Sequence, residues 1–563
     1  MAQLQTGILI TVLCLSLLPT GGTEDNDLIH AILKGQEDTV EDYLTKGSDV
    51  NTKDSNGISA LAWAARKGYL EITELLLSKG ANIEIKDKDK KTPLLYAAEN
   101  GHTDVVELLL ARKGNKKAKD AEGNDALTWA TRSGHADTVE FLLANDFDIE
   151  TKYTNEKTPL IHAAQNGHTD VVDLLISKGA NIKARDDNDM DALLWASWNG
   201  HIDTVDFLLL KGWDLEVRER NGKTALICAA QNGHNDVVES LITKGAFIEA
   251  RDNEGNTALH WSSRNDHGDV VKLLLSKGSD INAKDRYGKT PLLYSAQNSH
   301  VEVTDMLLSK KADITLEDNE GMDALLLAAW NGSIDIVELL YSRGWNFEVK
   351  GRRGETPLIF AAQKGHTDVA EFLISKRAKL EIKDNYGFDA LLWATWNGHT
   401  DTVDLLLSRN FNIEVRDRNE KTPLIYSAEN GHTDVINLLL SKGADVTARD
   451  NQGADALLWA TWNGHVEAVN LLLANNLSLA VRDMNGKTPL IYAAENGHTD
   501  IVDLLLSKGA NVEDEDNQGT NALIWARINK NTDVQDLILS RNVTNFNKNS
   551  DLRLITISVY ITE

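Results

Sequence analysis

The chain has 563 residues, a formal net charge of −27, and a composition that is 42% hydrophobic and 25% charged. This composition is too apolar for a disordered chain and too charged for a membrane-embedded one. Because Asp and Glu are spread over the whole length, a partner attracted over long range would be basic. Nucleic acid is disfavoured as a partner, since phosphate binding needs a stripe of Lys and Arg that this acidic chain does not show.

The start of the chain differs in composition from everything after it. Met1 to Pro19 carry no acidic or basic side chain, and the largely apolar run from Gly7 to Leu18 is too short to span a bilayer. This pattern predicts a signal peptide over residues 1–22 and a secreted, extracellular protein. An uncleaved anchor and a chance apolar start are the alternatives. No later stretch is apolar enough for a transmembrane helix, so no membrane span is expected in the mature chain.

The two cysteines, Cys14 and Cys228, bear on the redox chemistry of the chain. Cys14 lies in the predicted signal peptide, so the mature chain would have one thiol and no intramolecular disulfide. Cys228 occupies a helix position that holds Tyr or Trp in neighbouring repeats. This placement favours a packing role over a reactive one.

An internal repeat runs through most of the chain, and the spacing from Ser59 to Thr92 recurs without a slip as far as Asn521. One residue of each repeat, which we call the anchor, is always Ser, Thr, Asp or Asn. These residues accept a hydrogen bond from the free amides at a helix start, so we expect a helix to begin directly after each anchor. Positions are counted from the anchor below. The anchors are Ser59, Thr92, Asp125, Thr158, Asp191, Thr224, Thr257, Thr290, Asp323, Thr356, Asp389, Thr422, Asp455, Thr488 and Asn521.

Each repeat predicts two helices and a loop. In the repeat that opens at Thr92, the first helix starts at Pro93, since proline is tolerated at the first helical position. It ends at the turn Asn100-Gly101-His102, where glycine can take the left-handed conformation that stops a helix. A second helix follows from Thr103 to Leu110, with apolar residues at helical spacing. The remainder of the repeat predicts a loop with hairpin character.

These repeats resemble ankyrin repeats. The Thr-Pro-Leu opening, the Gly-His turn and the Leu-Leu-Leu run carry the resemblance, which covers residues 26 to about 541. It implies an all-α repeat solenoid of about 16 helix-turn-helix units with hairpin fingers, whose first helices line a concave groove. The fourth residue of the family tetrapeptide is usually His. Here it is Leu or Ile in nearly every repeat, with His260 an exception, so apolar packing is expected to replace the inter-repeat hydrogen bonding of that His.

The domain organisation follows from the repeat. We predict a signal peptide at 1–22, an N-terminal capping repeat at 23–55, fifteen ankyrin repeats over 56–541 and a C-terminal tail at 542–563. The first repeat has Gln36-Glu37-Asp38 where other repeats have the Gly-His turn. Such a departure is typical of the polar terminal units that solenoids require.

The repeats alternate between two types, so the pattern has a second period that spans one repeat of each type. All 13 Trp lie in the type that reads Asp-Ala-Leu-Leu-Trp, mostly at positions 4 and 7. On a helix these positions adjoin each other, opposite the Leu at position 2, so Trp195/Trp198, Trp393/Trp396 and Trp459/Trp462 should form aromatic plates. Position 4 holds Trp63, Trp129, Trp195, Trp261, Trp393, Trp459 and Trp525, and position 7 holds Trp198, Trp330, Trp396 and Trp462.

Position 7 is the candidate binding surface. In the other repeat type it holds Glu or Gln, which indicates solvent exposure, and an exposed Trp is better explained by binding than by packing. For position 4, burial between successive helices is the favoured interpretation. The residues predicted to contact a protein partner are Trp198, Trp330, Trp396 and Trp462, together with Arg66, Arg132 and Arg264 at the same position of other repeats.

The sequence shows no pattern typical of catalysis, a cofactor or a metal. Twelve of the 15 His occupy position 10, from His102 to His498, and such a recurrence indicates a structural role. His-Glu-x-x-His, Cys-x-x-Cys, phosphate-loop and nucleophile-elbow motifs do not occur, so we expect no enzyme, no cofactor and no metal site. Asn-x-Ser/Thr sequons at Asn331, Asn476 and Asn542 are candidate glycosylation sites in a secreted chain, although chance explains each about as well.

Three functions remain open at the level of sequence. The first is a secreted, non-catalytic scaffold that binds a protein partner on its concave surface. The second is a secreted toxin or effector, because ankyrin arrays resembling this one occur in large venom proteins. The third is an intracellular ankyrin adaptor whose apolar start is not a signal peptide.

Overall fold

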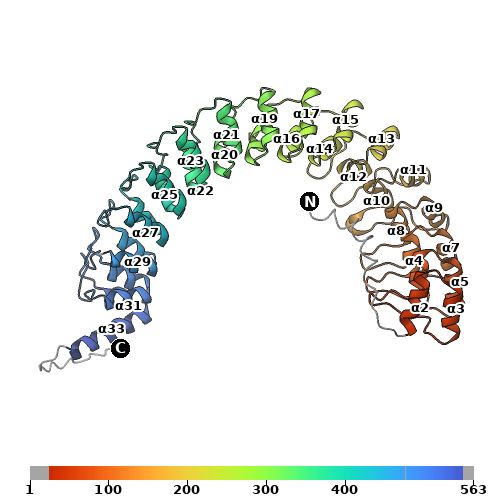
Figure 1. Ribbon diagram of the computed structural model, residues 1–563, viewed down its shortest axis with the longest axis horizontal. Coiled ribbons are helices and arrows are strands. Elements are labelled where there is room, and N and C mark those ends of the chain that lie inside the picture. Colours follow the sequence, from red (N-terminus) through yellow and green to blue (C-terminus); the bar gives the residue numbers. More distant parts are fainter. Residues whose placement is uncertain (1–23, 476, 549–563) are drawn as a thin grey trace. The chain divides into compact units, whose positions relative to one another are not determined.

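The computed structural model describes residues 24–475 and 477–548. The predicted signal peptide, Asn476 and the end of the tail lie outside these residues. The chain divides into two compact units, one ending at Asp280 and the other beginning at Ile281. Each unit is a stack of helix pairs in which the first and second helices of the repeats form two layers (Figure 1).

In the first unit, the first helix of each repeat begins directly after the anchor, as predicted. These first helices are α2 (Glu24–Leu33), α4 (Ala60–Lys67), α6 (Pro93–Glu99), α8 (Ala126–Ser133), α10 (Pro159–Gln165), α12 (Ala192–Asn199), α14 (Ala225–Gln231) and α16 (Ala258–Arg264). The second helices are α3 (Glu37–Thr45), α5 (Leu70–Ser78), α7 (Thr103–Ala111), α9 (Ala136–Ala144), α11 (Thr169–Ser177), α13 (Ile202–Leu210), α15 (Asn235–Thr243) and α17 (Gly268–Ser276), with a short 3₁₀ helix η2 (Thr154–Glu156) in one loop.

The second unit repeats this order. Its first helices are α18 (Pro291–Gln297), α20 (Ala324–Asn331), α22 (Pro357–Lys364), α24 (Ala390–Trp396), α26 (Pro423–Glu429), α28 (Ala456–Trp462), α30 (Pro489–Asn496) and α32 (Ala522–Ile528). Its second helices are α19 (Val301–Ser309), α21 (Ile334–Ser342), α23 (Thr367–Ser375), α25 (Thr400–Ser408), α27 (Thr433–Ser441), α29 (Val466–Ala474), α31 (Thr499–Ser507) and α33 (Thr532–Lys548). The last helix, α33, therefore continues past residue 541, where the sequence placed the start of the tail.

The loops between helix pairs contribute almost no β-structure. In the part of the chain that the structure describes, the only bridges are isolated ones that pair Lys53 with Ser59 and Glu515 with Asn521. The prediction of an all-α repeat solenoid is confirmed. No helix among the described residues has the length and apolarity needed to cross a membrane.

Most anchors cap the first helices as their residue type predicts, whereas the Thr92 hydroxyl makes no capping hydrogen bond. The Asp389 carboxylate accepts a hydrogen bond from the Leu392 amide at 2.9 Å, and Asp191 accepts one from Leu194 at 2.9 Å. Burial raises the pKa of both carboxyl groups to about 6, against the opposing effect of these amide hydrogen bonds. An anchor therefore satisfies free amides at the helix start from a buried position.

Small residues let the first helices of neighbouring repeats approach each other. In α24, Leu391 at position 2 and Ala394 and Thr395 at positions 5 and 6 are fully buried. Within each unit the first helices make more extensive contacts with one another than the second helices do. The second helix α25 contributes Val403 and Leu406 to the same core. Positions 4 and 7 of the first helices and the hairpin loops form the other side of this layer, which we call the first-helix face.

The histidine at position 10 joins each repeat to the one before it. His465 donates a hydrogen bond from Nε2 to the Glu429 carbonyl oxygen at 3.0 Å, and its ring lies against Gly431. The inter-repeat hydrogen bonding expected to be lost with the tetrapeptide His is thus supplied here. The same bond joins His102 to Arg66, His135 to Glu99, His168 to Arg132, His201 to Gln165, His234 to Trp198, His267 to Gln231, His366 to Trp330, His399 to Gln363, His432 to Trp396 and His498 to Trp462.

A pair of glycines in one repeat tests the steric part of this junction. Gly431 and Gly443 both have positive φ, but a Cβ on Gly431 would lie 2.6 Å from His465 Nδ1, whereas one on Gly443 would meet nothing within 4 Å. We expect Gly443→Ala to lower the free energy of unfolding by about 1–2 kcal/mol, the cost of a left-handed alanine. Gly431→Ala should cost about 1–3 kcal/mol more, because the histidine ring must also move.

Urea unfolding followed by far-ultraviolet circular dichroism measures both variants. Gly443→Ala is the matched control, since it differs from Gly431→Ala in the steric contact and not in the sign of φ. Equal losses for the two variants would contradict a steric role for the histidine ring.

Candidate functional site

The aromatic residue at position 4 is tied to the hairpin of its own repeat. Trp459 donates from Nε1 to Asp450 Oδ2 at 2.8 Å, and the Tyr426 hydroxyl donates to Asp417 Oδ2 at 2.7 Å. The other oxygen of Asp450 accepts two amides of its own hairpin. Position 4 therefore holds the hairpin against the first helix. The expected burial of position 4 is confirmed, since these rings are buried or half-buried throughout.

The aspartate five residues before the anchor, which we call the hairpin aspartate, was missed by the sequence analysis. This aspartate recurs in most repeats, and the recurrence is visible in the sequence. It is replaced in most repeats whose residue at position 4 is not Trp or Tyr, which indicates that the two residues act together. In those repeats Tyr153 accompanies His162, Glu219 accompanies Cys228 and Gly351 accompanies Phe360, while only the repeat of Leu327 keeps its aspartate, Asp318. Cys228 is fully buried, and burial raises the pKa of its thiol to about 12, in keeping with the predicted packing role.

A second missed contact crosses from one repeat to the next. The Lys421 side chain, which directly precedes an anchor and is 11% exposed, lies 2.7 Å from Glu429 Oε2 at position 7 of its own repeat. Its Nζ also lies 3.5 Å from the centre of the Trp459 ring in the following repeat. The same cation–π contact joins Lys91 to Trp129 at 3.5 Å, Lys157 to Trp195 at 3.6 Å, Lys223 to Trp261 at 3.9 Å and Lys487 to Trp525 at 4.1 Å.

The tryptophans at position 7 pack forward, onto the next repeat. Trp462 lies 4.8 Å from the Tyr492 ring, and Trp396 lies 5.0 Å from the Tyr426 ring, between ring centres. Trp330 meets Phe360 edge-on at 5.2 Å. These rings therefore contribute to repeat-to-repeat packing as well as to the surface.

The predicted aromatic plates form in one case of three. Trp459 stacks on Trp462 at 5.8 Å, as predicted. The prediction is wrong for Trp195/Trp198 and Trp393/Trp396, whose rings make no such contact among the described residues. In the repeat of Trp393 and Trp396, Phe388 contacts both rings, at 4.9 Å and 5.8 Å between ring centres. The equivalent residue beside Trp459 and Trp462 is Ala454, which has no ring.

The residues at position 7 differ in how much of their side chain is exposed to solvent. The prediction of solvent exposure is confirmed for Trp396 and Trp462, which are 37% and 43% exposed, and for Arg132 and Arg264. It is wrong for Trp198, Trp330 and Arg66, which are half-buried. The arginines stack on tryptophan rings at position 4 of their own repeats, Arg66 on Trp63 at 5.0 Å, Arg132 on Trp129 at 5.4 Å and Arg264 on Trp261 at 5.2 Å. Whether any of the seven contacts a partner stays a prediction.

Two of the three predicted glycosylation sites lie among the described residues. Asn331 is exposed at the end of α20, and its side-chain amide donates to the Gln297 carbonyl oxygen at 2.9 Å. A glycan on that nitrogen would replace one of its two hydrogens. Asn542 lies within α33. Over residues 24–475 and 477–548, no three His, Cys, Asp or Glu side chains come together as a set of metal ligands.

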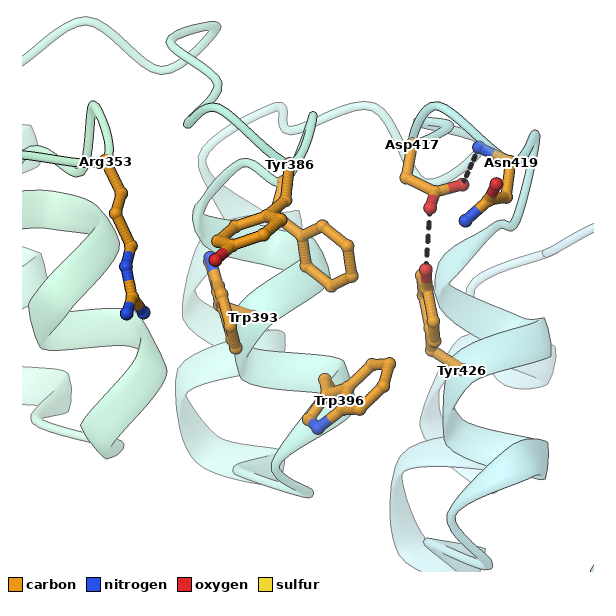
Figure 2. A pocket seen from close by; sticks show the side chains of 8 residues that line it. Arg353, Tyr386, Trp393, Trp396, Asp417, Asn419 and Tyr426 are labelled. Atoms are coloured by element: carbon orange, nitrogen blue, oxygen red, sulfur yellow. Dashed lines mark hydrogen bonds between the residues drawn. The ribbon is translucent and has the colours of Figure 1, made fainter.

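A cavity of about 420 Å³ opens on the first-helix face of the second unit (Figure 2). Five rings surround it, from one hairpin and the first helices α24 and α26. Two polar side chains of the next hairpin and one arginine complete its lining. The lining residues are Arg353, Tyr386, Phe388, Trp393, Trp396, Asp417, Asn419 and Tyr426.

Stacked helix pairs with hairpins, repeated at one constant spacing, define an α-helical repeat solenoid. The family described as "Ankyrin repeats (3 copies)" matches nearly the whole described chain, and the chain belongs to this family. The matches cover residues 28–120, 80–153, 110–186, 127–219, 193–285, 283–351, 325–418, 410–483 and 478–550. A search of curated proteins found no match.

His162 gives the first unit a pH-dependent stability. Burial is the main reason that its pKa falls to about 4, with smaller effects from Lys157 and Arg132. Below pH about 6.5 the unfolded chain binds a proton here that the folded chain does not, so stability falls as the pH drops from about 6.5 toward 4. His162→Phe should remove about 1–2 kcal/mol of the loss between pH 7.5 and pH 5.

Phenylalanine suits this position because Phe360 occupies it in another repeat. Urea unfolding measures the free energy of unfolding of the wild-type chain and the variant at both pH values. The change between the two pH values is then compared between the two proteins, so the contributions of other titrating groups cancel. An unchanged pH dependence in the variant would show that His162 is not responsible.

The two positions of one helix should differ in their contribution to stability. Trp459 is held by a hydrogen bond, a cation and a neighbouring ring, so Trp459→Ala should cost about 3 kcal/mol or more. Trp462 is partly exposed and contributes ring contacts alone, so Trp462→Ala should cost about 1 kcal/mol. Chemical denaturation of both variants measures the difference, and equal losses would make Trp462 a core residue.

Proposed function

We propose that this chain is a non-catalytic scaffold, secreted from the cell, that binds a protein partner on the first-helix face. Membership of the ankyrin-repeat family supports the scaffold role, since proteins of this family are generally non-catalytic interaction scaffolds. Function in such proteins lies in the residues displayed on the common fold, so the proposal depends on specific side chains.

The observation that carries the proposal is the exposure of Trp396 and Trp462. Each ring packs one side on the next repeat and leaves 37% and 43% of its surface to solvent, respectively. Large aromatic side chains fixed in this way lose little conformational entropy on binding and are typical of interface anchors. Both lie in the second unit, which is where we propose the main contact.

Charge favours a basic partner. The net charge of −27 is distributed along the chain, and it would raise the association rate of a positively charged protein. The apolar leader at residues 1–22 supports secretion, because its length and flanking residues suit a signal peptide. A partner in the extracellular fluid is therefore the first to seek.

A double substitution tests the proposed interface. Trp396→Ala with Trp462→Ala should weaken binding of the partner at least about tenfold, because each anchor typically contributes more than about 1 kcal/mol. Leu210→Ala is the matched control, since Leu210 is 83% exposed but lies at the end of a second helix. The wild-type chain captures the partner from the extracellular fluid of its source, and the purified partner is then titrated against all three proteins.

Binding should also weaken as salt is raised, because the attraction between an acidic chain and a basic partner is screened. A partner that binds the double variant as tightly as the wild-type chain would contradict the proposed surface. So would an equal loss in the Leu210 control.

A further inference from the structure

One of the seven tryptophans at position 4 lacks the cation that accompanies the others. Five of them carry the ammonium of a lysine from the preceding repeat at 3.5–4.1 Å from the ring centre. Trp63, in the first of these repeats, has the Arg66 guanidinium at 5.0 Å. Trp393 has no cation over its ring among the described residues. The residue that would supply it, directly before the anchor Thr356, is Glu355 instead of Lys.

The replacement follows from a second change in the same hairpin. Gly351 stands where most repeats have the hairpin aspartate, so the hairpin lacks its usual carboxylate. Glu355 compensates, since its Oε2 accepts a hydrogen bond from the Arg353 amide at 3.0 Å. A lysine cannot accept this bond. Glu355 therefore closes the hairpin of this repeat. Because it stands in place of the lysine, no lysine ammonium that the structure describes lies over Trp393.

The hydrogen-bond acceptor for the missing lysine is nevertheless present. In the repeats of Lys157 and Lys223, the ammonium donates to a glutamine at position 7, with distances of 2.8 Å to Gln165 and 2.7 Å to Gln231. The equivalent residue here is Gln363. It is half-buried, and its side chain makes no hydrogen bond within the described part of the chain. The Trp393 ring and the Gln363 side-chain oxygen therefore lack the lysine ammonium that contacts both equivalent groups in other repeats.

The Trp393 ring also lines the cavity of about 420 Å³, whose lining includes neither Glu355 nor Gln363 (Figure 2). The cavity therefore adjoins the position of the missing lysine and shares the Trp393 ring with it. Trp393 Nε1 donates to Asp384 at 2.8 Å and the ring contacts Phe388 at 4.9 Å, so its orientation is fixed before any ligand arrives. Trp396 and Tyr426 offer apolar surface next to it. These rings suit the aliphatic stem of a lysine, which buries its methylene groups while its ammonium stays with polar partners.

We propose that the Trp393 face that other repeats cover with their own lysine binds the ammonium of a lysine side chain of the protein partner, whose aliphatic stem lies in the adjoining cavity. The inference rests on the proposed function, because it identifies a contact of the same face. Glu355 adds a negative charge where other repeats have a positive one. Arg353, an exposed cation at the edge of the cavity, opposes binding and limits its affinity.

The test restores the common pattern of the repeats. Gly351→Asp with Glu355→Lys returns the hairpin aspartate and the internal lysine together. The variant should fold as the repeat of Leu327 does, where Asp318 accepts two hairpin amides without a donor at position 4. A Cβ on Gly351 would lie nearest to the Glu355 carboxylate, at 3.1 Å, a side chain that the variant removes, and next to the Phe360 ring at 3.5 Å. The internal ammonium should then occupy the site and exclude the ligand.

The full chain carries 5-fluorotryptophan, and the fluorine signal of Trp393 is assigned with Trp393→Phe. N-acetyl-lysine methylamide is titrated against the wild-type chain, with the uncharged N-acetyl-norleucine methylamide as the control ligand. The lysine compound should shift the Trp393 signal to saturation, and the norleucine compound should not. In the repaired variant the response should be at least about tenfold weaker, because the ring already carries a cation.

Two single substitutions separate the contributions. Gln363→Leu should weaken lysine binding several-fold, and Arg353→Gln should strengthen it, because a like charge is removed. A Trp393 signal that ignores lysine, responds equally to norleucine or responds unchanged in the repaired variant would overturn the proposal. Weaker binding in Arg353→Gln would overturn it as well, since it would indicate an anionic ligand.

The experiment distinguishes the two proposals because it needs no partner. If the lysine site fails while partner binding still depends on Trp396 and Trp462, the scaffold function stands without this contact. If the lysine site is present and the partner does not use the first-helix face, the proposed interface is wrong and the cavity binds lysine for another purpose.

Discussion

The contact between a turn histidine and the glycine of the preceding repeat sets the geometry on which the rest of each unit depends. The ring of His465 lies so close to Gly431 that a Cβ there would come within 2.6 Å of its Nδ1, and its Nε2 is bonded to the carbonyl oxygen of Glu429. A contact this tight fixes the distance and the rotation between neighbouring helix pairs. An insertion inside a repeat would misplace it, which accounts for an anchor spacing that never slips.

The second period, which spans one repeat of each type, has a physical reason in the chemistry of the two types. The type without tryptophan mostly supplies a lysine before its anchor and always a Glu or Gln at position 7, while the other type mostly supplies a tryptophan at position 4. Lys421 contacts both Glu429 and Trp459 and so joins one type to the next. The side chains of the two types are complementary. Where Glu355 replaces the lysine, Trp393 of the following repeat lacks its cation.

The first-helix face is therefore both a packing surface and a display surface. Most of its rings are used internally, by hairpin aspartates, lysines and the aromatic residues of adjacent repeats. Trp396 and Trp462 keep part of their surface exposed, and a cavity opens beside Trp393, which is why we propose these places for a partner. The proposed lysine site lies where the internal pattern is interrupted, because there Trp393 lacks the lysine that the fold supplies to tryptophans of other repeats.

The sequence by itself determined the helix starts, the two-helix repeat, the ankyrin class and the structural role of the position 10 histidines, because capping, periodicity and glycine turns act over a few residues. It could not decide which residues at position 7 are exposed, since Trp198 and Trp396 have the same place on their helices and differ only in how the surrounding repeats cover them. Nor did it identify the lysine–tryptophan contacts or the cavity at Trp393. These depend on side chains more than one repeat apart in sequence that only the stacking of repeats brings together.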